Sequence, residues 1–327
     1  MDYVQNIIGE CYDIEQKKLE IPNSSEISNQ KHHELYVTYD KDHCWQYDIR
    51  QKNAEEDKIN SGLTDEEIAS LTPNDFDFAY VPSERVETCR EIVRFIERHE
   101  WLGKMPNRPT HRFTARYRGK LAGVIIMAVP NTISKMLGKD TFKLEKLISR
   151  GACISWSPKN LNSWLIMKSI RWMIANTEYR AFTAYSDPEA RELGSIYQGC
   201  NFLYLGQASG TVKQYLDPNR EDMGWFSDRH FRHKSMYKKY AANLGISAEE
   251  WKKHMNKYSP NWDTISTSLK EKLKSELQKY KASCKVRVTK PKHKYVYIKG
   301  RNKNETKKLK RLFHNTKVLP YPKNRGE

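Results

Sequence analysis

The hydrophobic pattern changes at about residue 77, where a polar segment gives way to alternating helical and strand-like spacing. Ser83 can cap a helix whose apolar residues recur at helical spacing as far as Ile96. Residues 111–117 then alternate between apolar and polar, and residues 121–129 are a near-continuous apolar run. The turn between them predicts a hairpin of adjacent antiparallel strands, with the second strand at the centre of a sheet.

The same alternation continues downstream. We expect a strand at 144–154, a loop at 157–162, a helix at 163–175, a strand at 181–185, a helix at 188–199 and a strand at 202–206. This order predicts a fold of the α/β (α+β) class, with a mixed sheet and helices against it.

Both ends of the chain differ from this core. Residues 1–75 are polar and contain one clear helix start, a capping box formed by Thr64 and Glu67. Toward the other end, helices are expected at 231–244 and 265–280, and a strand at 295–298. We therefore expect a polar N-terminal arm at 1–75, a core at 76–228 and a basic, largely helical extension at 229–327. The sequence does not decide whether that extension is an independent domain.

Composition indicates a polar protein, because hydrophobic residues make up 38% of the chain and the mean hydropathy is -0.84. No apolar run is long enough for a membrane span, and the N-terminus has no secretory pattern, so we expect a cytoplasmic protein. The six cysteines form no CxxC pair and are expected to be thiols. The cluster of His32, His33, Glu34, His43 and Cys44 matches no zinc pattern, so no metal site is predicted, and a metal requirement stays open.

Charge is strongly uneven along the chain. The net charge is +17, but residues 229–327 hold 28 Lys and Arg against 7 Asp and Glu, so they carry +21 and the rest carries -4. Such a block binds polyanions through counterion release, and the aromatic residues interleaved with it favour nucleic acid over a solvated tail.

We expect non-specific contacts with duplex DNA phosphates from the two densest basic stretches. Tyr295 and Tyr297 could stack on bases or pack as a strand face. The cationic candidates are Lys292, Lys294, Lys299, Arg301, Lys307, Lys308, Lys310 and Arg311.

A candidate anion site lies at 153–163, where a strand end runs through a polar loop into a helix. The unpaired amides and positive dipole of a helix N-terminus bind phosphate, although plain N-capping explains the polar residues equally well. The candidate cofactor-binding residues are Lys159, Asn160, Asn162, Ser163 and Trp164.

Residues 185–206 form a strand, a helix bearing Tyr197, and a turn before Phe202 and another strand. This stretch resembles the last motif of the Gcn5-related (GNAT) acyltransferases, whose equivalent tyrosine protonates the departing coenzyme A thiolate. The resemblance assigns that role to Tyr197, with Asn201-Phe202 standing where Gly-Phe is usual. A core tyrosine is the alternative. The family's glycine-containing pyrophosphate loop is missing, and SPKNLNS stands in its place.

Residues 101–210, about a third of the chain, resemble the Mom family of phage DNA adenine-modification proteins, a divergent branch of the GNAT fold. The resemblance lies in LISRGACIS leading into KNLNSWLIMKSIRWM, and in AYSDPEARELGSIYQGCNFLYLGQ. It implies a mostly antiparallel sheet with helices on its faces. It further implies that acetyl-CoA or a related acyl donor is the cofactor. It also implies transfer of an acyl-derived group to the exocyclic amine of adenine, which protects phage DNA from restriction.

That amine is a poor nucleophile, so the site must supply a base or an activated donor. Asp187 is the first candidate for the base, and an N-cap before Pro188 is its alternative. Tyr185, Ser149, Arg150 and His111 are further catalytic candidates near the same strand ends. A base inside a duplex must also be flipped out.

Two other functions stay open. The chain could be an acetyl-CoA-dependent N-acetyltransferase acting on protein or small amines. It could also be a non-enzymatic DNA-binding phage protein that keeps the fold. The donor, the sequence context of modification and the oligomeric state are not fixed by the sequence.

Overall fold

The computed structural model describes residues 44–106, 108–130, 136–138, 142–207, 212–256, 259–313 and 317–322. These residues belong to two compact units. The first unit contains Thr38–Ser209 and Pro291–Glu327, and the second contains Gly210–Lys290. In the described ranges, no helix combines the length and apolar character needed to cross a bilayer.

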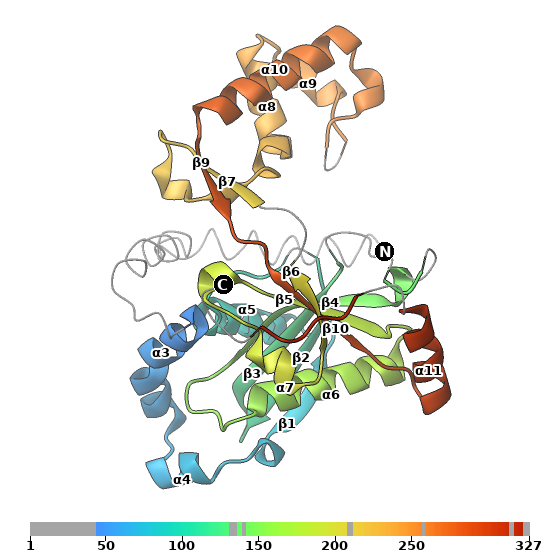
Figure 1. Ribbon diagram of the computed structural model, residues 1–327. Helices are drawn as coiled ribbons and strands as arrows, with labels where there is room; N and C mark the ends of the chain where they lie inside the picture. The colour runs from blue at the N-terminus through green and yellow to red at the C-terminus, as the bar shows by residue number, and fades with distance from the viewer. Residues whose placement is uncertain are drawn as a thin grey trace. The chain divides into compact units, whose positions relative to one another are not determined.

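A seven-stranded sheet forms the centre of the first unit (Figure 1). Its pairs are antiparallel except for β4 and β5, which run parallel, so the expected mixed, mostly antiparallel sheet is confirmed. In spatial order the strands are β1 (Asp77–Val81), β2 (Pro109–Tyr117), β3 (Lys120–Ala128), β4 (Glu145–Cys153), β5 (Ala181–Ser186), β10 (His293–Ile298) and β6 (Leu203–Gln207).

The strand expected at 295–298 is present as β10, but it belongs to the central sheet. It pairs with β5 on one side and β6 on the other. Tyr295 and Val296 point to opposite faces of the sheet, and both are fully buried there. A strand that is buried on both faces is typical of the interior of a sheet. The boundary expected at residue 228 therefore does not coincide with the observed units, and residues 210–290 are an insertion between two strands of the core.

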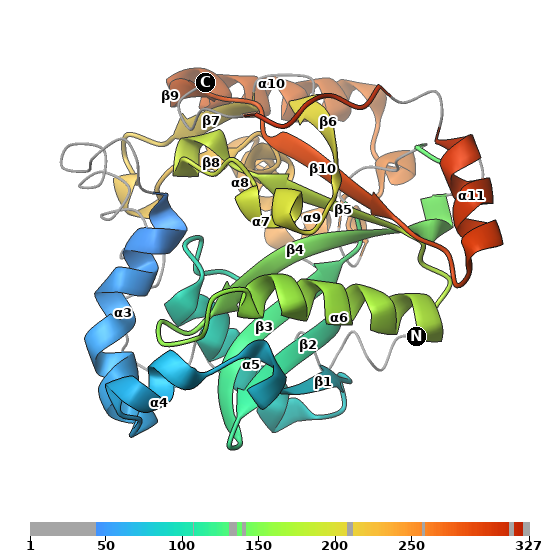
Figure 2. The same cartoon turned by 60° about the horizontal axis from the view of Figure 1, so that its bottom comes forward.

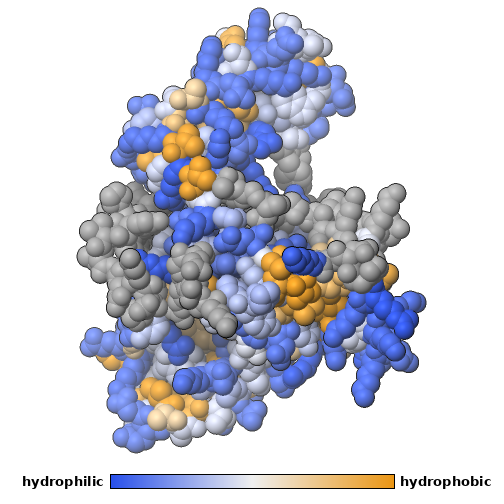
Figure 3. Space-filling model, in the orientation of Figure 1, coloured by the Kyte–Doolittle hydropathy of each residue, from blue (hydrophilic) through white to orange (hydrophobic). Residues whose placement is uncertain are grey.

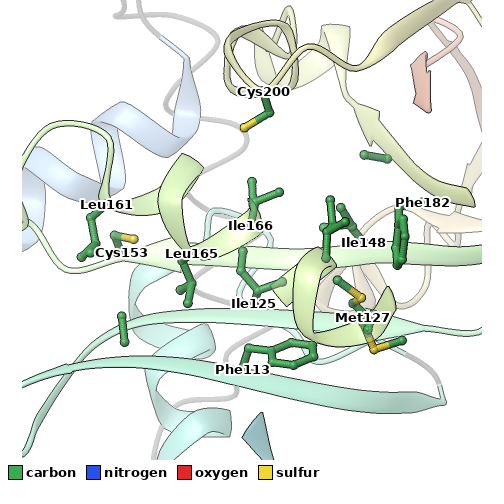
Figure 4. Packing of buried hydrophobic residues seen from close by; sticks show 14 of the residues in the cluster. Phe113, Ile125, Met127, Ile148, Cys153, Leu161, Leu165, Ile166, Phe182 and Cys200 are labelled. Atoms are coloured by element: carbon green, nitrogen blue, oxygen red, sulfur yellow. The ribbon is translucent and has the colours of Figure 1, made fainter. Parts of the chain in front are cut away.

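Two helices cover opposite faces of this sheet. α5 (Val86–His99) packs on β3 and β4 through Ile92, Phe95 and Ile96. α6 (Leu161–Asn176) crosses the other face, as Figure 2 shows. In Figure 4, Phe113, Ile125, Met127 and Ile148 of the strands lie under Leu165 and Ile166 of α6, and these residues form the main hydrophobic core.

The described part of the expected N-terminal arm packs on the core. Its first helix, α3 (Trp45–Ser61), was not predicted. The Gln46 and Asn53 side chains donate hydrogen bonds to the carbonyls at the end of α5, so α3 is fixed to that helix. The capping box of Thr64 and Glu67 is confirmed at the start of α4 (Asp65–Ser70), which leads through η1 (Pro73–Asp75) into β1.

The helix expected at 188–199 is interrupted. It consists of η3 (Pro188–Ala190) and α7 (Ser195–Gly199), with Arg191 and Gly194 in the left-handed region between them. At Gly194, φ is +73° and an added Cβ would lie 2.5 Å from the Tyr295 ring. Only glycine fits this position, so the turn brings α7 directly against β10.

A short helix, α11 (Lys303–Leu312), follows β10 and was not predicted; Leu309 is its buried residue. Its Glu305 binds Arg180, which is 4% exposed, at 2.7 Å. Arg180 also donates to the carbonyls of Thr177 and Tyr179. One guanidinium thus joins the start of β5 to the last helix of the chain.

The second unit combines a small sheet with helices. Its strands, in the order β8-β7-β9, are β7 (Val212–Leu216), β8 (Phe226–Ser227) and β9 (Lys285–Thr289). Its helices are α8 (Lys234–Asn243), α9 (Ala248–Lys253) and α10 (Thr267–Ser283), with short turns η4 (Glu221–Met223), η5 (His230–Arg232) and η6 (Trp262–Thr264). The remaining short element of the chain, η2 (Phe142–Leu144), precedes β4.

Glu305→Ala should lower the free energy of unfolding by about 2 kcal/mol, because it leaves the buried Arg180 guanidinium without its carboxylate. Denaturant unfolding would measure this loss. Glu271→Ala, at an exposed position of α10, is the control and should change stability by less than about 0.5 kcal/mol. Equal stability of the two variants would contradict the role given to the Arg180 pair.

Candidate active site

The parallel strands β4 and β5 separate part of the way along their length. Their pairing ends at Ile148 and Ala184, although β4 continues to Cys153 and β5 to Ser186. The register between β3 and β4 also shifts at this point, so Ser149 forms a bulge. A bulge bends its strand and disrupts the hydrogen-bond ladder. Beyond the bulge, the facing edges of β4 and β5 therefore do not pair with each other. Such an opening can admit an extended ligand.

The segments that follow β4 and β5 hold buried polar side-chain atoms that have no partner among the described residues. They are Ser155 Oγ and Trp156 Nε1 in the loop after β4, Asn162 Oδ1 at the start of α6, and Ser186 Oγ at the end of β5. Trp156 packs against Phe76 and Tyr117. A buried polar group without a partner costs free energy, so Ser155, Asn162 and Ser186 are positions where a ligand or water can supply the missing partner.

The start of α6 has no side-chain cap among the described residues. Its N-cap is Asn160, which has a left-handed φ of 69° and makes no capping hydrogen bond. The Ser163 hydroxyl donates to the Asn160 carbonyl instead of capping an amide. The capping alternative therefore explains neither Asn162 nor Ser163. The Leu161 amide donates to the Pro158 carbonyl, so the Asn162 and Ser163 amides are the ones that can bind an anion.

The other predicted cofactor residues divide into two groups. Lys159 and Asn160 are exposed in the loop, and Asn162 Oδ1 lies 3.9 Å from where a Cβ on Gly151 of β4 would be. Trp164 instead packs edge-on against Phe78 of β1, with the Lys168 ammonium 5.3 Å from its ring centre. These contacts indicate core packing for Trp164 rather than donor binding.

Arg50 of α3 anchors the loop after β4, a role that the sequence did not indicate. It donates to the carbonyl of Ser155 at 3.0 Å and to that of Ser157 at 2.7 Å. The Ser155 amide in turn donates to the buried Asp57 carboxylate of the same helix at 3.3 Å. α3 therefore fixes the shape of the candidate anion loop from 98 to 107 residues away in the chain.

Tyr197 lies on α7 at the edge of the core, where its ring packs against Phe202 and Tyr295 with centroids 5.4 and 5.5 Å apart. Burial raises the pKa of its phenol, and the nearby Glu192 and Glu100 carboxyls act in the same direction. The phenol is therefore protonated at neutral pH and can act as an acid. On the same turn, the Cys200 thiol lies 3.8 Å from the Ser163 carbonyl, so α7 contacts the start of α6. Asn201, in the place of the family's glycine, has a left-handed φ of 58°.

A buried carboxyl, Glu100, and a half-buried one, Glu192, accompany Tyr197, and sequence reasoning missed both. Glu100, at the end of α5, is 8% exposed and accepts from the Leu102 and Gly103 amides. Burial raises its pKa to about 7, against the opposing effect of Arg150. Burial also raises the pKa of Glu192, before α7, to about 7, and the negative charge of Glu100 adds to this rise. Each carboxyl can gain or lose a proton near neutral pH.

Arg150 and Asp187, both predicted, lie beside these carboxyls. Arg150 Nε is 3.8 Å from Glu100 Oε2, and its guanidinium is oriented by the carbonyls of Lys104 and Ser149. Asp187 caps η3 by accepting from the Glu189 amide, so its N-cap alternative is confirmed. It also binds Lys292 at 2.7 Å. With its carboxylate engaged in this way, Asp187 is a weaker candidate base than Glu192 or Glu100.

Tyr185 and His111 are the two remaining catalytic candidates, and they lie in different parts of the sheet. Tyr185 is on β5 opposite Lys294 of β10, and burial raises the pKa of its phenol. His111 of β2 packs with Trp172 and Tyr179 at the far end of α6, ten residues or about 15 Å along the helix from Asn162. Burial lowers the His111 pKa to about 4, so it is a neutral core residue. The structure does not bring His111 into the candidate site.

The candidate DNA-binding residues also separate. Tyr295 is fully buried and its hydroxyl donates to the Leu193 carbonyl, while the Tyr297 ring packs on Phe202, so for both the packing alternative holds. Arg301 is exposed and its guanidinium lies over the last carbonyls of α6. The surface over α11 is strongly hydrophilic in Figure 3. The exposed candidates are Lys292, Lys299, Arg301, Lys307, Lys308, Lys310 and Arg311, and Lys294 is half-buried.

Among the described residues no group of three His, Cys, Asp or Glu side chains could hold a metal ion. Cys44 is the one described member of the cluster noted in the sequence, and its other four residues lie outside the described ranges. Cys153, Cys200 and Cys284 are buried thiols, as expected for small core residues.

The raised pKa values of Glu100 and Glu192 predict a dependence of stability on pH. Both groups bind protons more tightly in the folded chain than the ordinary value of 4.5 allows, so their contribution is full below about pH 4.5 and is lost as the pH rises through about 7. The double variant Glu100→Gln and Glu192→Gln should therefore lose less stability than the parent chain between pH 5 and pH 8, by about 1–3 kcal/mol.

Thermal or denaturant unfolding of both proteins at the two pH values gives this difference, in which the histidine contributions cancel. Glu66→Gln, exposed on α4, is the control and should follow the parent chain. Parallel pH profiles for the parent and the double variant would refute the assignment.

Comparisons with known proteins bear on this arrangement. Among solved structures, a putative acetyltransferase from Salmonella typhimurium with its cofactor acetyl-CoA is similar at 10% identity and a TM-score of 0.31, over 42% of this chain and 83% of that one. No curated protein matches the chain. The model of the Mom protein family matches residues 85–323, which include the core, the insertion and the last strand. The family model covers most of the chain, and we conclude that the chain belongs to the Mom protein family.

Proposed function

We propose that this protein transfers an acyl-derived group from a coenzyme A-type donor to the exocyclic amine of adenine in DNA, and so protects phage DNA from restriction. The observation that supports this function best is the opening between β4 and β5. The segments that follow these strands hold buried polar atoms without described partners, and a protonated phenol and two titratable carboxyls lie on or near α7.

The residues of the opening fit such a donor. The two available amides of α6 and Lys159 can bind the phosphates, and Ser155 and Asn162 offer buried polar atoms that lack described partners. Arg50 fixes the loop that carries them. When bound, the donor supplies an activated thioester.

In this proposal a carboxyl accepts one proton and the Tyr197 phenol donates another. The adenine amine loses a proton as it forms its new bond, and Glu192 or Glu100 can accept that proton because each has a pKa near 7. Tyr197 can give its phenol proton to the sulfur that departs. Arg150 holds the Glu100 carboxyl in place and adds positive charge beside it. The two proton transfers use different groups, so the site needs no single residue to act twice.

The exposed cations of the first unit support duplex DNA as the substrate. Lys292 and Lys299 flank β10 directly, and the lysines of α11 follow it. Phosphate contacts there would help offset the few kcal/mol needed to flip an adenine out of the stack.

Expression of the parent chain in bacteria should produce a heavier adenine nucleoside, detected by mass spectrometry of digested DNA. Tyr197→Phe should lower its yield by about 100-fold, because the proton donor is lost while the ring packing remains. Tyr237→Phe, in the second unit, is the matched control and should retain the parent yield. Ordinary nucleosides alone, from cells that contain folded parent protein, would overturn the proposal. Donor turnover that ignores DNA would point instead to an N-acetyltransferase of protein or small amines.

Arg50→Ala should raise the KM for the acyl donor about tenfold with a smaller effect on kcat, because the loop after β4 loses its two carbonyl anchors. Steady-state kinetics with DNA in excess would measure both constants. Lys52→Ala, exposed on the same helix, should leave them unchanged. An unchanged KM in Arg50→Ala would show that α3 does not shape the donor site.

A further inference from the structure

Two helices of the second unit are joined by a tight turn. α8 ends at Asn243 and α9 begins after Ser247, with Gly245 between them at a φ of 78°. The Ile246 amide donates to the Ala241 carbonyl, and the Gly245 amide donates to that of Ala242, which is the Schellman pattern. The Ser247 hydroxyl then caps α9 by accepting from the Glu250 amide. The direction of the second helix is therefore fixed by the turn.

A third helix completes a small core beneath this pair. Ala241 of α8 and Leu273 of α10 are fully buried, and Trp251 of α9 is 3% exposed. All three belong to one hydrophobic cluster that contains residues of α8, α9 and α10. The small side chain at Ala241, four residues before the glycine, allows α9 to approach α8 closely. This is the arrangement of a helix-turn-helix: two helices joined by a short glycine-containing turn and supported by a third.

The outer face of α9 is exposed among the described residues. At 100° per residue, Glu249 and Lys253 both lie about 160° away from the buried Trp251, so they point outward side by side. Both are exposed, and neither side chain makes a hydrogen bond or ion pair with another described residue. This face therefore presents an acceptor and a donor that are not used by the described residues of the unit.

We propose that α8 and α9 form a helix-turn-helix that reads the major groove of duplex DNA, with α9 as the recognition helix. The charge of the unit fits this partner, because residues 210–290 hold 18 Lys and Arg against 9 Asp and Glu. Lys234 and Lys238 are exposed on α8, the helix that crosses the phosphate backbone in this motif. Glu249 can accept from the cytosine amine, and Lys253 can donate to guanine.

This inference rests on the proposed function, since it takes DNA as the substrate, and it adds a division of labour. The cations around β10 and on α11 bind phosphates without regard to sequence. α9 selects the sequence around the adenine that is modified. The insertion between β6 and β10 would then determine where the core acts.

The first experiment selects bound duplexes from a random DNA library with the full-length protein. The parent chain should enrich a defined sequence. The double variant Glu249→Ala and Lys253→Ala should lose about 100-fold in preference for it, because it lacks two base contacts that each discriminate by about tenfold. Affinity for unrelated DNA should stay within about twofold, because the double variant loses one negative and one positive charge and its net charge is unchanged. Glu271→Ala with Lys274→Ala, exposed on α10, removes the same charges and should keep the parent preference.

A second measurement separates this inference from the proposed function. Modified adenines are mapped in DNA from cells that express each protein. Modification at the same sequences by the parent chain and the α9 variant would overturn the helix-turn-helix assignment and leave the enzyme proposal intact. Sequence preference without any modified adenine would do the reverse. A parent chain without sequence preference, or an α9 variant that keeps it, would show that this face serves another partner.

Discussion

The separation of β4 from β5 is the constraint on which the site depends. Four residue pairs hold the strands in parallel, and the bulge at Ser149 then turns β4 away. A sheet normally satisfies its backbone groups within itself, so an interior strand edge that lacks a partner is costly unless something else occupies it. The loop after β4, the start of α6 and the end of β5 also hold buried side-chain atoms without partners among the described residues, so a ligand that entered the opening could pair with both kinds of group.

Desolvation of three groups near α7 determines their protonation states. Glu100, Glu192 and Tyr197 all favour their neutral forms because burial penalises charge, and the carboxyls do so just enough to titrate near neutrality. Arg150 and Lys292 prevent a larger rise in the pKa of Glu100. Two acids with pKa values near 7 beside a phenol that stays protonated provide an acceptor and a donor at the same pH.

The elements with strong periodicity could be predicted from the sequence, and the contacts between distant segments could not. The β2–β3 hairpin and α6 follow directly from their apolar patterns, and Tyr197 follows from the family motif. β1 was missed because only Val81 of its five residues is buried, so its alternation is weak. Glu100 and Arg50 gave no signal, because their roles arise when α5 and α3 dock against residues about 50 to 107 positions away. Glu192 lies within the recognised motif, but its proton affinity depends on burial, which spacing does not encode.

The position of β10 has a consequence for synthesis. The strand that fills the gap between β5 and β6 lies beyond residues 210–290, so the ribosome completes the whole insertion before the central sheet can close. During that interval the edges of β5 and β6 that will pair with β10 are unpaired. Unpaired strand edges can pair with other chains, so the nascent chain is vulnerable to aggregation. The insertion is a compact unit whose β7 and β9 strands pair with each other, so it can fold as soon as residue 289 has been synthesised, before the core that surrounds it in sequence.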